Sequence, residues 1–198
     1  MRHSLRTAII ALPMLLPLGG WTRGAELLSL QPQSKLWVEG GSTIRSWSCK
    51  SEDVNAVVEA TGTHAVTQLL AGEKVVKTVD VTLSGEKLEC GGGTINDHMR
   101  KALKVRDFPT ISFRLATYDI KHGADGISGT LVGTLTLGGV KKSIDIPATG
   151  TIENGALHVL GSYEMKMTDY DLTPPTLMFG RIKVRDNVTV KFDLLLKS

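Results

Sequence analysis

Apolar and polar side chains alternate along most of the chain after Lys35. The apolar positions of each segment share one parity, in the runs 36–40, 79–83, 111–115, 127–137, 140–146, 157–167 and 188–196. Polar residues such as His158, Glu164 and Asp193 take the opposite parity, and Lys142 interrupts one run. A period of two with one polar face is typical of antiparallel strands that cover a single apolar interior.

Short glycine-containing gaps separate several of these runs. They are residues 123–126, the pair Gly138 and Gly139, and the pair Asn154 and Gly155. Each gap is of hairpin size, and Asn-Gly favours the positive φ angles of a type I′ turn. About eight or nine one-sided strands can close into a barrel, which leaves no exposed edge. The pattern therefore predicts an all-β antiparallel barrel, with a two-sheet sandwich as the alternative.

One stretch breaks the alternation and predicts a short helix over 94–105. Thr94 or Asn96 can cap its start, and Asp97 falls in the first turn. An apolar stripe contains Met99 and Leu103, while Phe108 and Pro109 end the helix and return the chain to an extended strand. We expect this helix to cross an end or a side of the barrel. The preceding residues 91–93 lack the lysine of a phosphate-binding loop, so we interpret them as a flexible bend.

The N-terminal 24 residues have the layout of a secretory signal peptide. Arg2 and Arg6 precede an apolar run over 7–20, which is short for a membrane span. Small residues favour a cut after Gly24 over one after Ala25, and an uncleaved anchor is the alternative. Removal of the segment is expected to leave one domain over 25–198 that has no membrane span. We expect this domain to be periplasmic or secreted. The same cut removes three arginines and no acid, so twenty basic and twenty acidic residues remain. This balance predicts no electrostatic footprint for nucleic acid or an anionic membrane.

The mature part contains two cysteines, Cys49 and Cys90. In an oxidising compartment an even pair predicts a disulfide, and two separate buried thiols are the alternative. The histidines have no second ligand at a convincing spacing, so we expect no metal and no cofactor. His98, next to Asp97, is expected to be structural. No nucleophile motif is present, and we predict no catalytic residues.

Several segments resemble the YceI-like family of exported, lipocalin-like proteins. They are NDHMRKALKVRDFPTISFRLATY (96–118), GTLTLGGVKKSIDIPATG (133–150), SKLWVEGGSTIRSWSC (34–49) and MTDYDLTPPTLMFG (167–180), followed by VTVKFDLLL. The resemblance spans about 34–196 and implies a lipocalin-like barrel of about eight strands with one inserted helix. Residues 166–172 depart from the family's Asn-Arg-x-Asp-Phe-Gly segment, which leaves the ligand open.

The interior of the predicted barrel is the candidate binding site. A barrel of this size holds either side chains or one small elongated ligand. Gly129, Gly133 and Gly161 add no side-chain volume, and methionines repack around an apolar guest. The candidate residues of the interior and mouth are Ile111, Phe113, Leu115, Leu135, Tyr163, Met165, Met167, Leu177, Met178, Phe179 and Phe192. For each of them, plain core packing is the alternative. Leu177, Met178 and Phe179 are predicted to form a lid, with a fixed plug as the alternative.

These observations predict a non-catalytic protein of the cell envelope that binds, carries or sequesters an elongated apolar ligand. A polyisoprenoid, a quinone and a fatty-acid derivative all fit as ligands. The protein is expected to be a monomer or a homodimer. A polar head group is expected near Asp169, Thr176 and Arg181 at the mouth. The alternatives are a structural or stress-related envelope protein with a filled barrel, and an accessory to a quinone-linked electron-transfer enzyme.

Overall fold

A computed structural model describes residues 24–51 and 53–198. Apart from Gly24, the predicted signal peptide lies outside the described residues. The strands are β1 Ala25–Leu30, β2 Lys35–Ser42, β3 Ser46–Ser51, β4 Val54–Thr61, β5 Val76–Ser84, β6 Leu88–Glu89, β7 Thr110–Tyr118, β8 Lys121–Gly123, β9 Gly126–Leu137, β10 Val140–Glu153, β11 Ala156–Lys166, β12 Thr176–Leu177 and β13 Ile182–Lys197.

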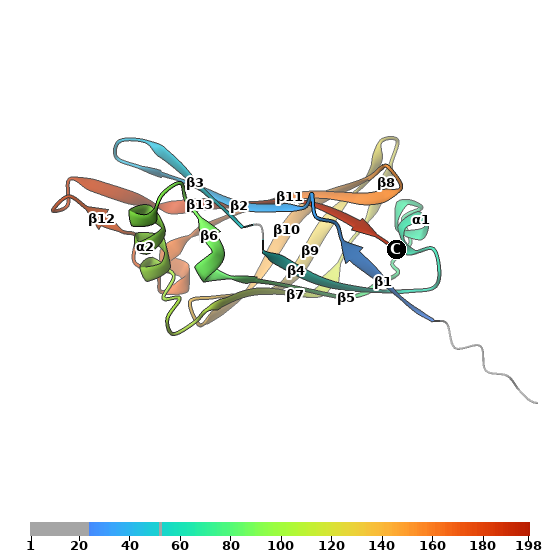
Figure 1. Cartoon of the computed structure of the whole chain (residues 1–198). Helices are drawn as coiled ribbons and strands as arrows, with labels where there is room; N and C mark the ends of the chain where they lie inside the picture. Colours follow the sequence, from blue (N-terminus) through green and yellow to red (C-terminus); the bar gives the residue numbers. More distant parts are fainter. Residues whose placement is uncertain (1–23, 52) are drawn as a thin grey trace, which may run out of the picture.

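All of these strands pair antiparallel, and the sheet closes on itself. The order β1-β4-β5-β7-β9-β10-β11-β13 returns to β1 through the pair Leu30 and Leu196, which gives a closed eight-stranded barrel (Figure 1). The predicted lipocalin-like barrel is confirmed, and the sandwich alternative is wrong. Because the barrel is closed, each main strand is paired on both sides and none is an unpaired edge strand.

Breaks in the first half of the chain make the strand count larger than eight. The long strand β13 pairs with β2 over Val184–Asp193 and with β1 near Leu196, so β1 and β2 follow one another along the same side of β13. In the same way β3 pairs with β2 and β4 pairs with β1. The alternating pattern did not predict β1, β3 or β4: β1 and β3 have only six residues each, and in β4 the exposed Val57 puts an apolar residue on the outer parity.

The predicted hairpins are confirmed at all three glycine-containing gaps. Gly123 pairs with Gly126, Leu137 with Val140, and Glu153 with Ala156. Asn154 and Gly155 have φ angles of 50° and 77°, as a type I′ turn requires.

Two short α-helices lie at opposite ends of the barrel (Figure 1). Helix α2, Gly93–Ala102, is the predicted helix, although it ends three residues before Val105. Its N-cap is Gly92 and makes no side-chain cap bond, so the predicted caps Thr94 and Asn96 are wrong, and Asp97 lies beyond the first turn. Helix α1, Ala65–Leu70, was not predicted. Two 3₁₀ turns, η1 at Gly85–Lys87 and η2 at Met167–Tyr170, complete the described helical segments.

The buried residues form one apolar cluster at each end. The cluster at the α1 end contains Leu28, Val58, Ala60, Ala65, Val66, Leu69, Val75, Leu157 and Leu196. The cluster at the α2 end contains Leu137, Met165, Met167, Tyr170, Leu172 and Val188. The inward side chains between the two clusters, such as Phe113, Leu131 and Val190, are only half-buried although they face the interior. The middle of the barrel is therefore less tightly packed than its two ends.

Candidate ligand-binding cavity

A cavity of about 440 Å³ occupies the barrel interior. Its wall is made of inward apolar side chains from every main strand, among them Leu36, Val81, Leu131, Val159 and Leu194. These residues belong to the runs whose parity the sequence placed on the inner face. A largely apolar hollow of several hundred Å³ is of the size that proteins use for small-molecule ligands.

Nine of the eleven predicted site residues line this cavity. They are Ile111, Phe113, Leu115, Leu135, Tyr163, Met165, Met167, Leu177 and Phe192. Met178 and Phe179 do not belong to its lining, and their side chains are 65% and 110% exposed. Both have positive φ angles, 50° and 55°. Of the three residues expected to form a lid, only Leu177 therefore reaches the cavity in this structure, and the lid itself stays a prediction.

The glycines of the inner face contribute to the hollow in an indirect way. A Cβ atom at Gly161 would collide with the ring of its cross-strand partner Phe192, and one at Gly133 would collide with the ring of Phe113. These two aromatic rings thus lie against the barrel wall, over the glycines, and leave the centre open. At Gly133 and Gly161, the space that a side chain would take is thus occupied by an aromatic ring of the neighbouring strand.

Helix α2 supplies lining residues that the candidate list lacked. Ile95, His98, Met99 and Ala102 recur at helical spacing and face the cavity, together with Leu103. Their half-burial fits a helix that lies over this end of the cavity. The apolar stripe that contains Met99 is the sequence feature that indicates this face of the helix. The prediction did not include the helix in the binding site. Trp47 on β3, which lies between Ser46 and Ser48, also lines the cavity and is not among the predicted residues.

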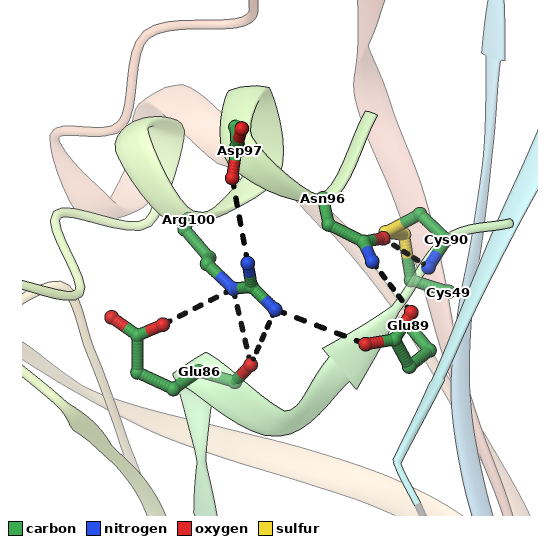
Figure 2. A network of polar contacts seen from close by, with 7 residues as sticks. All are labelled: Cys49, Glu86, Glu89, Cys90, Asn96, Asp97 and Arg100. Atoms are coloured by element: carbon green, nitrogen blue, oxygen red, sulfur yellow. Dashed lines mark hydrogen bonds and ion pairs between the residues drawn. A yellow bond between two sulfur atoms is a disulfide. The ribbon is translucent and has the colours of Figure 1, made fainter. Parts of the chain in front are cut away.

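Polar contacts and a disulfide attach α2 to the barrel (Figure 2). Cys49 on β3 and Cys90 after β6 form the predicted disulfide. The buried Asn96 accepts the backbone N–H of Cys90 at 2.7 Å and donates to Glu89 at 2.5 Å. Arg100 donates from Nη2 to the carbonyl of Glu86 at 2.9 Å and lies 3.1 Å from its carboxylate. The outer side of the helix is thus fixed while its inner side faces the hollow.

Few polar groups reach the cavity. At the α2 end the cavity lining includes Ser42, Arg45, Thr94 and His98. The residues expected to meet a head group are absent from the lining, and these are Asp169, Thr176 and Arg181. Tyr170 is fully buried beside Tyr163, which lines the cavity. Burial is the main cause that raises the pKa of Tyr170, and the neighbouring Tyr163 is the second. The Tyr170 hydroxyl has no hydrogen-bond partner among the described residues. Lys142, the residue that interrupts its run, lies over the Tyr170 ring at 5.9 Å.

The described residues contain no group of three or more His, Cys, Asp or Glu side chains that could hold a metal ion. Nor does any helix in this part of the chain have the length and apolar character needed to cross a bilayer. His158 lies between two carboxylates on the outer surface, Glu153 at 3.0 Å and Asp193 at 2.8 Å. His98 is the histidine that reaches the cavity.

Comparisons with known proteins agree with this architecture. Residues 40–196 match the model of the YceI-like domain. BcnA of Burkholderia cenocepacia has 17% identity and a TM-score of 0.63, over 82% of this chain and 95% of that one. A YceI protein of Campylobacter jejuni has 19% identity and a TM-score of 0.56, over 76% and 84%. A polyisoprenoid-binding domain from Saccharophagus degradans, implicated in plant cell wall breakdown, has 14% identity and a TM-score of 0.55, over 87% and 97%. No curated protein matches the chain.

Proposed function

Since the chain belongs to the YceI-like family, we propose that it binds one elongated apolar molecule inside the barrel without acting on it chemically. The observation that supports this function is the apolar cavity of about 440 Å³ in the barrel interior. A guest there would be stabilised by about 0.8 kcal/mol for each methylene group removed from water. A polyisoprenoid, a quinone or a fatty-acid derivative has this chemistry, and the similar Saccharophagus domain is named for the first of them.

We place this function in the periplasm or outside the cell. The Cys49–Cys90 disulfide fits an oxidising compartment, and the predicted signal peptide fits export. There the protein would carry or sequester the molecule, because an apolar tail in the barrel is shielded from water. The filled-barrel alternative has less support, since the half-buried side chains in the middle of the barrel surround unoccupied volume.

Mass spectrometry of organic extracts from the purified protein tests this proposal. Val81 faces the cavity and the adjacent Thr82 is exposed, so Val81→Trp fills the hollow while Thr82→Trp is a matched control on the outer face. We expect an apolar molecule to co-purify with the natural chain and with Thr82→Trp, and to be largely lost from Val81→Trp. Extracts without any such molecule, together with failure to take up added polyisoprenol, quinone or fatty acid, would contradict the proposal.

A further inference from the structure

Two neighbouring hairpins project from the α2 end of the barrel. We call residues 42–46, between β2 and β3, and residues 176–185, from β12 into β13, the hairpin tip. Thr43 joins them: its N–H donates to the carbonyl of Lys183 at 3.0 Å, and its hydroxyl donates to that of Arg181 at 3.4 Å. In Figure 1 the two hairpins extend side by side beyond α2. The tip is thus one continuous surface feature.

The tip bears the most exposed large apolar side chains of the described residues. Phe179 is 110% exposed, and Met178 and Ile44 are each 65% exposed. Met178 and Phe179 are the two central residues of a tight turn, closed by the Gly180 N–H on the Leu177 carbonyl at 3.1 Å. Both have positive φ, which is strained for bulky residues. The turn at the other end of the barrel uses Asn154 and Gly155, the residues that this geometry favours.

The comparison of these two turns indicates that the sequence of the tip is not explained by folding alone. A Met-Phe turn has a poor backbone fit and exposes apolar surface to water, and neither property helps the barrel fold. Strained residues of this kind are characteristic of functional positions, where an external contact offsets their cost.

The tip is also strongly basic. Residues 40–51 and 172–185 contain no aspartate or glutamate, and Arg45, Arg181, Lys183 and Arg185 are all exposed there. None of these four cations forms an ion pair with another described residue. The balanced charge of the mature chain predicted no electrostatic footprint for nucleic acid or an anionic membrane, but folding brings these cations together at the tip that bears Phe179.

We propose that the hairpin tip docks on an anionic lipid bilayer. Phe179, Met178 and Ile44 enter the interface, and the four cations meet lipid phosphates. Two basic tips repel each other, which argues against a second copy of the chain as the partner. Ile44 and Arg45 also belong to the cavity lining, as do Leu177 and Ile182. Docking therefore places the mouth of the cavity at the membrane surface, where an apolar guest can pass without crossing water. This last step depends on the proposed function, but docking itself does not.

Vesicle co-sedimentation tests docking, with soluble protein recovered from the periplasm of an expression host and its N-terminus determined by mass spectrometry. Vesicles of phosphatidylglycerol mixed with phosphatidylcholine are compared with vesicles of phosphatidylcholine alone. Phe179→Ser is the test variant, and Ile152→Ser, which removes a 56% exposed apolar residue at the opposite end, is its control. Arg181→Ser is paired with Lys121→Ser, an exposed cation at that same opposite end.

We expect binding to the anionic vesicles that Phe179→Ser weakens about tenfold and Arg181→Ser about fivefold, with both controls unchanged. No binding by the natural chain, or equal binding by Phe179→Ser, would overturn the proposal. Light scattering that shows oligomers without vesicles, lost in Phe179→Ser, would identify a second copy as the partner instead. Lipid content of the purified Phe179→Ser protein separates the two proposals. Retained ligand with lost docking supports both, whereas an empty natural barrel that still docks refutes only the proposed function.

Discussion

The two ends of the barrel are covered by helices that are held in different ways. At the α1 end, Ala65, Val66 and Leu69 of the helix are buried within a cluster of strand residues. At the α2 end, the buried residue of the helix is the polar Asn96. Helix α2 is held by the Cys49–Cys90 disulfide and by Arg100, while Ile95 and Met99 face the hollow.

This difference shows how one fold both closes a barrel and keeps it hollow. A helix fixed by its apolar face fills the space beneath it, because burial of that face is what holds it. A helix that is also fixed by a disulfide and by polar contacts on its outer side depends less on the packing beneath it, which here comes from Ala102 and the following Leu103. The apolar inner face of α2 is therefore available to a guest, and the α2 end is the candidate entrance.

Removal of the disulfide is the change with the largest expected effect. The two cysteines are 41 residues apart, and opening a loop of that length lowers the free energy of unfolding by about 4 kcal/mol in the chain-entropy model. The double variant Cys49→Ser/Cys90→Ser measures this in urea unfolding, compared with the natural chain. We also expect hydrogen exchange to rise first in α2 and to remain slow in α1. Equal loss of protection at both ends would contradict the comparison.

Matched alanine substitutions in the two helices should lower the free energy of unfolding by amounts that differ about threefold. Leu69 on α1 is 4% exposed inside its cluster, so Leu69→Ala should lower the free energy of unfolding by about 3 kcal/mol. Met99 on α2 is half-buried against the cavity, so Met99→Ala should cost about 1 kcal/mol or less, because it enlarges an existing hollow. Thermal and urea unfolding measure both. Equal costs would mean that α2 is packed as tightly as α1.

The sequence predicted the barrel well because its evidence is local. Strand parity assigned Phe113, Tyr163 and Phe192 to the inner face, and the type I′ turn at Asn154 was evident from two residues. Helix α1 was missed because six residues give too little periodicity, and because its first N–H is capped by Glu26, 39 positions away. Such a contact is visible only after folding.

Two features of the site were beyond sequence reasoning for different reasons. The rings of Phe113 and Phe192 lie over glycines of neighbouring strands, a placement that depends on the strand register. Met178 and Phe179 are exposed in a turn where both have positive φ angles, which sequence rules reserve for glycine and asparagine. In both cases the backbone geometry decides what an apolar side chain does, and residue type alone does not.

The polar attachment of α2 should depend on Asn96 more than on any surface ion pair. Asn96→Ala leaves the buried N–H of Cys90 without its acceptor, which should lower the free energy of unfolding by about 2 kcal/mol. Asn96→Asp keeps an acceptor for that N–H but loses the donor to Glu89. Removal of the exposed pair of Lys87 and Asp53, by Lys87→Ala, should cost about 0.5 kcal/mol or less. Calorimetry measures all three, and an Asn96→Ala protein as stable as Lys87→Ala would contradict this role.

The smallest expected effect is a pH dependence at the α1 end. Hydrogen bonds from the Ser198 hydroxyl and then from the Ala65 N–H lower the pKa of Glu26 below its usual 4.5. The unfolded chain therefore binds a proton at a higher pH than the folded chain, so the stabilisation is complete above about pH 4.5 and is lost as the pH falls through the lowered pKa. Glu26→Gln should reduce stability at neutral pH by about 0.5 kcal/mol, because this carboxylate is partly exposed. Urea unfolding of both proteins across this acidic range should show their difference vanish at the acidic end. A difference that persists or grows on acidification would show that Glu26 does not cap α1 as a carboxylate.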